Sequence, residues 1–103
     1  MKTQILAKAN KFAKKHAESS LSNWKYDKDY DCLIGNPEGG YFEEYSNWDD
    51  FFAESLTSGL EIVGLSESEI EYFFENDIED EVLTEMCDSA NSVFEDYIEE
   101  FRK

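Results

Sequence analysis

The sequence lacks positive charge over most of its length: the 73 residues from Asp29 to Phe101 contain 23 acidic residues and no lysine or arginine. Seven lysines precede this stretch, and Arg102 and Lys103 follow it, which gives the chain a formal net charge of -16. Acidic groups within the stretch therefore have no basic partner of their own. Any surface built from it must be negative, which argues against direct binding to nucleic acid or to anionic membranes.

Cysteine, histidine and long apolar runs are also scarce, and each scarcity excludes a class of protein. Cys32 and Cys87 form no CxxC pair and have no histidines around them, so we expect reduced thiols in a cytoplasmic protein and no zinc site. The single histidine, His16, has no nucleophile at a suitable spacing, and no glycine-rich phosphate loop is present. No apolar run approaches the roughly 20 residues that span a bilayer. We therefore expect no enzyme activity, cofactor or membrane insertion.

Hydrophobic residues are nevertheless abundant enough for a folded core. They make up 41% of the chain, and aromatic residues make up 16%, whereas disordered chains contain few aromatics. A length of 103 residues corresponds to one domain. The apolar spacing predicts a single acidic domain over residues 1–103, with a helix-dominated α+β fold in the order helix, β-hairpin, then three helices.

The first and last predicted helices are the longest. The first spans residues 3–19 with Thr3 as its cap, and its lysines form a basic outer side that could rest against the acidic remainder of the protein. The last spans residues 78–101. A break is predicted before it at Asn76 and Asp77, with Asp77 as the N-cap of this last helix. Its predicted buried residues are Val82, Leu83, Met86, Ala90, Val93, Phe94, Tyr97, Ile98 and Phe101.

Two shorter helices are predicted from capping boxes, in which a serine and an acidic residue three positions later satisfy each other's backbone. Ser46 with Asp49 opens one helix, which stops near Gly59, and Ser66 with Glu69 opens the next. The apolar side chains expected inside these two helices and in the link after the first are Trp48, Phe51, Phe52, Leu56, Leu60, Ile70, Phe73 and Phe74.

Between the first two helices, alternating apolar and polar residues predict a β-hairpin. Residues 24–34 alternate as a half-buried strand does, with Tyr30 on the apolar side and Leu33 on the polar side. The composition of residues 35–40 is typical of a turn, and residues 41–45 are then expected to return as the second strand.

The same segment resembles an EF-hand calcium loop over residues 27–38. Asp27, Asp29, Asp31 and Glu38 occupy loop positions one, three, five and twelve, which supply ligands in that family. The segment departs from the pattern at position six, where Cys32 replaces the glycine of the sharp turn. No outgoing helix follows Glu38. The alternation favours the hairpin, and calcium binding by these four residues is kept as an alternative function.

Acidic residues recur at four-residue spacing within the predicted helices, which places them on shared faces. The rows are Glu71, Glu75 and Glu79; Glu81 and Glu85; Glu95 and Glu99; Asp96 and Glu100. Each like-charged pair destabilises a helix by a few tenths of a kcal/mol, and solubility needs a net charge of magnitude only about 2–8. These rows therefore indicate a function beyond solubility.

A uniformly negative surface is complementary to a protein surface that is basic because it holds nucleic acid. Duplex DNA carries one negative charge per roughly 1.7 Å of axis, and fixed carboxylates can imitate that density. By analogy with small phage and plasmid inhibitors, we expect a DNA-mimicking inhibitor of anti-CRISPR or anti-restriction type. The expected partner-binding residues are Asp49, Asp50, Glu71, Glu75, Asp77, Glu79, Asp80, Glu81, Glu85, Asp88, Glu95, Asp96, Glu99 and Glu100.

The expected partner is thus a basic nucleic-acid-binding protein, such as a host defence nuclease or effector, and a homodimer is left open. A second hypothesis is an immunity protein or antitoxin that neutralises a nuclease toxin away from its DNA groove. Aromatic residues such as Tyr41 or Tyr72 could add anchoring contacts if they are exposed.

Overall fold

The computed structural model describes residues 1–35 and 48–103. Its elements are helix α1 (Lys2–Ser20), a short 3-10 turn (Leu21–Asn23), strands β1 (Trp24–Asp27) and β2 (Cys32–Gly35), and helices α2 (Asp49–Ser58), α3 (Glu67–Glu75) and α4 (Glu79–Arg102). This order confirms the predicted helix-dominated α+β fold, with a helix, a hairpin and three further helices. None of the helices within the described ranges is both long enough and apolar enough to cross a bilayer.

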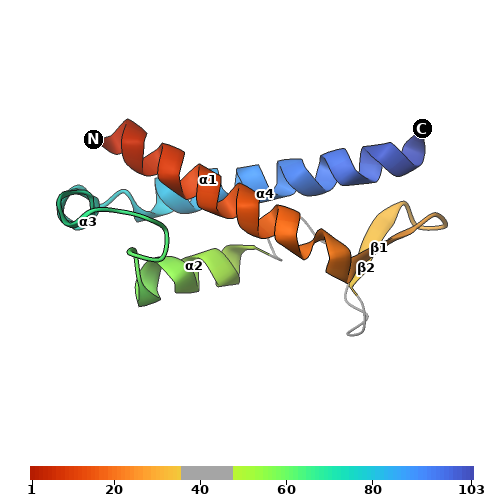
Figure 1. Ribbon diagram of the computed structural model, residues 1–103, viewed down its shortest axis with the longest axis horizontal. Helices are drawn as coiled ribbons and strands as arrows, with labels where there is room; N and C mark the ends of the chain where they lie inside the picture. The colour runs from red at the N-terminus through yellow and green to blue at the C-terminus, as the bar shows by residue number, and fades with distance from the viewer. Residues whose placement is uncertain (36–47) are drawn as a thin grey trace.

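Helices α1 and α4 form the long axis of the molecule, which measures 47 × 26 × 19 Å (Figure 1). They lie side by side and run in the same direction, because Lys2 and Asn10 of α1 contact Glu81 and Glu85 near the start of α4. The side of α1 that faces the core carries small residues at four-residue spacing, Ala9, Ala13 and Ala17, all fully buried. Short side chains along such a ridge allow close packing of the two helices.

Helix α2 closes the core on one side, with Phe52 and Leu56 buried as predicted. The ring of Trp48, also buried, stacks on Phe52 at 5.6 Å and meets the edge of Phe94 of α4 at 5.1 Å. Phe51 lies at the margin and is 39% exposed, so the prediction that it is buried is wrong. In the described part of the core, aromatic side chains therefore fill the space between α2 and α4.

The strand predicted over residues 24–34 is wrong, because the chain reverses within it. Residues 28–31 form the turn, and β1 pairs with β2 in antiparallel register, with Tyr26 opposite Leu33. This turn sets even-numbered residues of β1 opposite odd-numbered residues of β2. Residues directly opposite each other share a face of the sheet, so the side chains that face the core are even-numbered in β1 and odd-numbered in β2. Leu33, predicted on the polar side, is consequently fully buried.

Two further details of the hairpin differ from the prediction. Tyr30, expected on the apolar side, lies in the turn and is 73% exposed. Gly35, expected to begin the turn, ends β2. The remainder of the predicted turn and the predicted return strand over 41–45 lie outside the described residues.

Three of the four predicted helix caps are not observed. The N-cap of α1 is Met1 and not Thr3, and the N-cap of α2 is Trp48, so that Asp49 is the first helical residue instead of the third. Ser46 lies outside the described residues. The break before α4 is confirmed, but Asp77 adopts a left-handed conformation with φ of 49°, and Ile78 is the N-cap. Aspartate tolerates this conformation better than most residues do.

The predicted core residues at the ends of α3 and α4 are partly exposed. Phe74 is 68% exposed and Phe101 is 49% exposed, so both predictions of burial are wrong. Each lies near a helix end, where fewer neighbouring elements are available to cover a side chain. Along the rest of α4, Leu83, Val93 and Tyr97 are half-buried, and the other predicted core residues are buried as expected: Val82, Met86, Ala90, Phe94 and Ile98.

Candidate functional site

The outward face of α4 carries a row of acidic side chains. Residues seven positions apart lie two helical turns apart on nearly the same face, and Glu81, Asp88 and Glu95 have this spacing. Glu85 and Glu99 lie beside the same line, four residues from Glu81 and Glu95. At a rise of about 1.5 Å per residue, the row from Glu81 to Glu99 is about 27 Å long. We call these five residues, together with Asp96, the α4 acidic face.

The α4 acidic face is costly to the helix that carries it. Glu95 and Glu99, like Asp96 and Glu100, are like-charged pairs at four-residue spacing, and each destabilises a helix by about 0.2–0.5 kcal/mol. Glu99 and Glu100 also lie in the last turn of α4, where the helix dipole favours positive charge. By contrast, the acids in the first turn of α4, Glu79, Asp80 and Glu81, are favourably placed.

The remaining predicted partner-binding residues are exposed but do not continue this row. Glu71 and Glu75 lie on α3, and Glu79 begins α4 beyond the break, so the predicted row of these three is wrong because two helices divide it. Asp77 lies in the break itself. Every predicted partner-binding residue is exposed except Glu85, which is half-buried. The predicted residues that lie outside the α4 acidic face are Asp49, Asp50, Glu71, Glu75, Asp77, Glu79, Asp80 and Glu100.

Positive charge reaches the acidic stretch only from outside it. The Lys2 ammonium of α1 lies 2.8 Å from the carboxylate of Glu81, and the Asn10 amide donates to Glu85 at 2.9 Å. Each of these contacts lies along the edge where α1 meets α4. The ion pair with Glu81 raises the pKa of Lys2. The basic side of α1 thus rests against the acidic remainder in part, as predicted, and covers one edge of the α4 acidic face.

A second lysine of α1, Lys8, holds α3 in place. Its ammonium is paired with the carboxylate of Glu69, a residue that is only 5% exposed. Glu69 also accepts a hydrogen bond from the Ser66 backbone at 2.9 Å, and its own N–H donates to the Ser66 hydroxyl at 3.3 Å. The capping box predicted here is therefore confirmed, and Lys8 with the capping bonds lowers the pKa of Glu69 to about 2. The tie to Lys8 has no local signal in the sequence.

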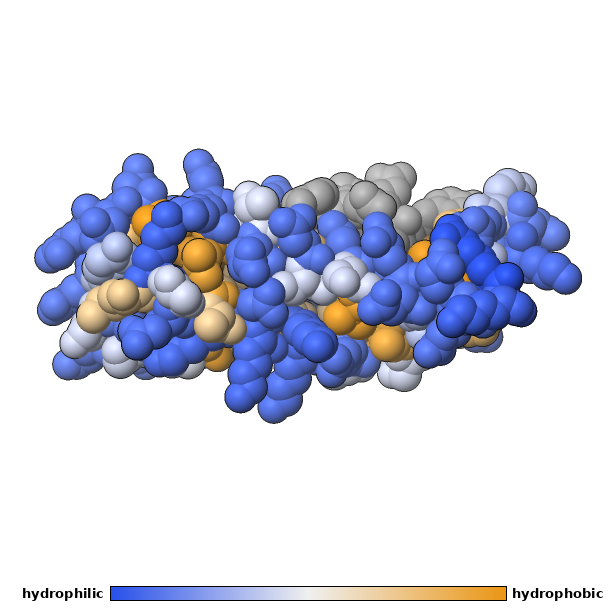
Figure 2. Space-filling view, turned by 90° about the horizontal axis from the view of Figure 1, so that it is seen from above, coloured by the Kyte–Doolittle hydropathy of each residue, from blue (hydrophilic) through white to orange (hydrophobic). Residues whose placement is uncertain are grey.

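A surface hollow of about 320 Å³ lies along the groove between α1 and α4. Its walls include Lys14 of α1 and Asp88, Ser92 and Asp96 of α4. Figure 2 shows the molecule from above, turned by 90° from the view of Figure 1. Its surface on this side is mostly hydrophilic, with separate small apolar groups. A large continuous apolar patch is not seen on this face, which fits a surface that binds through charge.

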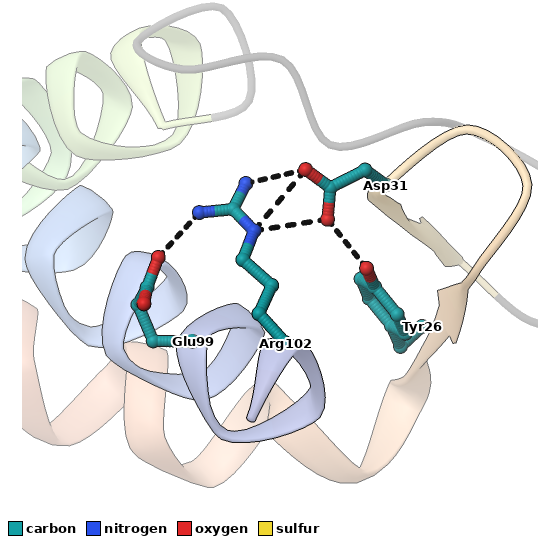
Figure 3. A network of polar contacts seen from close by, with 4 residues as sticks. All are labelled: Tyr26, Asp31, Glu99 and Arg102. Atoms are coloured by element: carbon teal, nitrogen blue, oxygen red, sulfur yellow. Dashed lines mark hydrogen bonds and ion pairs between the residues drawn. The ribbon is translucent and has the colours of Figure 1, made fainter.

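At the other end of α4, Arg102 fastens the hairpin to the helix (Figure 3). Its guanidinium donates to both carboxylate oxygens of Asp31, at 2.7 to 3.1 Å, and to Glu99. The Tyr26 hydroxyl donates to Asp31 from the neighbouring strand, and the Tyr26 ring stacks on Phe101 at 4.9 Å. The hydrogen bonds from Arg102 and Tyr26 lower the pKa of Asp31. Sequence reasoning missed this network because its members are 71 residues apart.

The network and the turn use two of the four carboxylates proposed for calcium. Asp31 is held by Arg102, and Asp27 accepts hydrogen bonds from the backbone N–H groups of Asp29 and Tyr30. Glu38 lies outside the described residues. Across residues 1–35 and 48–103, no three acidic, cysteine or histidine side chains gather in a way that could hold a metal ion. Calcium binding stays a prediction, without a preformed cluster in the described part of the chain.

The thiols and the histidine lie in environments that favour their neutral forms. Both cysteines are free thiols; Cys87 is buried, and burial raises its pKa to about 11. Burial also raises the pKa of Cys32. His16 stacks on Phe51 at 4.2 Å between ring centroids, and partial burial lowers its pKa. His16 is thus a half-buried histidine on α1.

No family model, no curated protein and no solved structure matches this chain. A functional conclusion therefore depends on the chemistry of the surface itself, and above all on the α4 acidic face.

Proposed function

We propose that this protein is a DNA-mimicking inhibitor that occupies the nucleic-acid-binding surface of a basic partner, such as a CRISPR effector or a restriction nuclease. The observation that carries the proposal is the α4 acidic face, a line of carboxylates on one rigid helix. This line costs helix stability, and among its carboxylates Glu81 is paired with Lys2 and Glu99 with Arg102. A solvated surface without a partner would not need it.

The charge density of the molecule supports the comparison with DNA. A net charge of -16 over a 47 Å long axis, 47 divided by 16, is about one negative charge per 3 Å. Duplex DNA carries one per roughly 1.7 Å. The protein thus has somewhat more than half the linear charge density of DNA, on a scaffold that no nuclease active site can hydrolyse as a nucleic acid.

The mechanism is competition and requires no chemistry. The negative field steers the inhibitor to the positive groove of its partner, which makes association fast and sensitive to salt. Carboxylates of the α4 acidic face then pair with the lysines and arginines that hold phosphates. DNA is excluded because the same cations cannot serve both ligands. The proposal places the protein in the cytoplasm, together with its target, where Cys32 and Cys87 stay reduced.

The test is displacement of a fluorescein-labelled duplex from purified candidate effectors and nucleases, followed by fluorescence anisotropy. The protein is expected to release the duplex competitively, with an apparent affinity that falls steeply between about 50 and 200 mM salt. The triple variant Asp88→Asn, Glu95→Gln, Asp96→Asn is expected to bind roughly tenfold more weakly at low salt, because each exposed ion pair contributes about 0.2–1 kcal/mol.

A matched control separates the face from the total charge. The triple variant Asp29→Asn, Glu54→Gln, Glu61→Gln removes the same charge from exposed positions outside α4. It is expected to displace DNA nearly as well as the wild-type protein does. Equal losses in the two variants would mean that total charge acts and the α4 acidic face does not. Failure to displace DNA from any candidate at low salt would end the proposal.

A nuclease-neutralising immunity protein or antitoxin is the second candidate, and exposed apolar side chains favour it. Phe74 and Ile62 are 68% and 66% exposed, and a pure imitation of DNA has no use for such residues, whereas protein interfaces do. This candidate predicts a complex that survives saturation of the toxin with DNA, a result that competitive mimicry excludes.

A further inference from the structure

Two large apolar side chains on the described surface are exposed to nearly the same extent, but they lie in different electrostatic surroundings. Phe74 of α3 is 68% exposed, and Ile62, in the turn between α2 and α3, is 66% exposed. Each exposes apolar surface that a partner could bury. Their charged neighbours decide which kind of partner that would be.

The neighbours of Phe74 are acidic. Residues three positions apart on a helix are surface neighbours, so Glu71 lies beside Phe74 on α3. Glu75 follows directly in sequence, and Asp77 lies in the break two residues beyond the end of α3. All three acids are exposed. A cationic surface is therefore attracted to the part of the molecule that presents Phe74.

The surroundings of Ile62 are mixed in charge: the exposed Glu61 precedes it in the turn, and lysines of α1 lie near the residues that follow it. The next two residues in the turn, Val63 and Gly64, line a hollow of about 350 Å³ whose other walls include Lys11 and Lys15 of α1. These lysines weaken the attraction of the region for a cationic partner. Although the two side chains are equally exposed, Phe74 is therefore better placed than Ile62 to contact a basic partner.

Phe74 projects from a helix whose other face and first turn are fixed. The preceding residue, Phe73, is buried at 3% exposure and meets the Phe74 ring edge-on, with centroids 5.4 Å apart. The start of α3 is fixed by the capping box of Ser66 and Glu69, and Lys8 of α1 is paired with Glu69. A partner that covers the ring therefore has to order its side-chain torsions but not the backbone that carries it.

We propose that Phe74 is the apolar anchor of the partner interface, and that it enters an apolar pocket in a cationic protein surface while Glu71, Glu75 and Asp77 pair with the cations around that pocket. The inference rests on the proposed function, because it assumes a basic protein partner. It adds that this partner is recognised as a protein and not merely as a field of charge. Buried aromatic residues at the centre of an interface commonly dominate its affinity.

The test uses two fluorescein-labelled peptides of equal charge as probes for such a surface: an amphipathic peptide of lysine and leucine at helical spacing, and an oligolysine. The wild-type protein is expected to bind the lysine–leucine peptide about tenfold more tightly than the oligolysine, an advantage of about 1.4 kcal/mol. Phe74→Ser should remove most of this advantage and leave the binding of oligolysine unchanged. Ile62→Ser, which has the same net charge, should leave both affinities unchanged.

Three other results would decide against the anchor. Equal loss of the advantage in Phe74→Ser and Ile62→Ser would show that general apolar exposure is responsible. An equal loss for both peptides in Phe74→Ser would assign Phe74 to stability, which circular dichroism would register independently. Sedimentation velocity that shows a dimer lost in Phe74→Ser would assign the face to a second copy of this chain. If oligolysine binds to no measurable extent while the lysine–leucine peptide binds through Phe74, the proposed charge mimicry fails and the anchor stands.

Discussion

The hairpin allows a sharp test of the tertiary structure, because two neighbouring residues of β2 exchange the roles expected from simple alternation. Leu33 is fully buried, whereas Ile34 is half-buried and pairs with the exposed Lys25. Truncation of each to alanine removes a comparable volume of hydrocarbon. The difference in cost between the two variants therefore reports which side chain faces the core.

The expected magnitudes follow from burial. Leu33→Ala should lower the free energy of unfolding by about 2–5 kcal/mol, because it removes a fully buried side chain and leaves a cavity. Ile34→Ala should cost about 1 kcal/mol, since its side chain retains contact with water and its site can be filled by solvent. For a domain of this size, about 1 kcal/mol corresponds to 4–8 °C in Tm, so the two variants should be clearly separated.

The measurement is urea unfolding followed by far-UV circular dichroism, with thermal melts on the same samples. The slope of the free energy against urea should stay constant among the wild type and both variants, which shows that the denatured state is unchanged. A larger loss for Ile34→Ala than for Leu33→Ala would refute the reversal at residues 28–31. It would restore the uninterrupted strand that the sequence pattern suggests.

Three further outcomes are expected. Because the pKa of Glu69 is lowered from its ordinary 4.5 to about 2, the stability it adds should be present above pH 4.5 and lost as the pH falls toward 2; Glu69→Gln should show little of this loss in melts across that range. Arg102→Gln removes the donor to Asp31 and should raise amide hydrogen exchange in β2 severalfold, more at low salt than at high salt, with α2 as the unaffected internal reference. At pH 8, Cys87 should react with a thiol reagent far more slowly than Cys32, because it is buried and its pKa is about 11; equal rates would contradict its burial.

Local patterns were sufficient to predict most of the helices. The capping box of Ser66 and Glu69 is observed, because both of its hydrogen bonds lie within four consecutive residues and need no distant partner. The buried residues in the middle of α4 also follow from helical spacing. Single-residue caps such as Thr3 were not observed, since a helix can begin a residue earlier when the side chain makes no capping bond.

The candidate surface was predictable in composition but not in geometry. The sequence identifies the acids that α4 displays, and helical periodicity groups Glu81, Asp88 and Glu95 on one face. It could not show that Lys2 lies against Glu81, or that Phe74 remains outside the core. Both depend on where α1 and α3 pack, and helical spacing alone treats every apolar residue as a core residue.

By itself, the sequence determined the sign of the surface and the helical character of the chain. A stretch of 73 residues without a basic side chain is negative in any fold, and apolar spacing of three and four residues forms amphipathic helices wherever they pack. Only the tertiary structure decided where the few cations lie. Lys8 and Arg102 meet Glu69 and Asp31 across 61 and 71 residues, because the parallel packing of α1 on α4 brings distant segments together. Ion pairs over such separations leave no periodic trace in a sequence, since they depend on the path of the chain and not on local propensity.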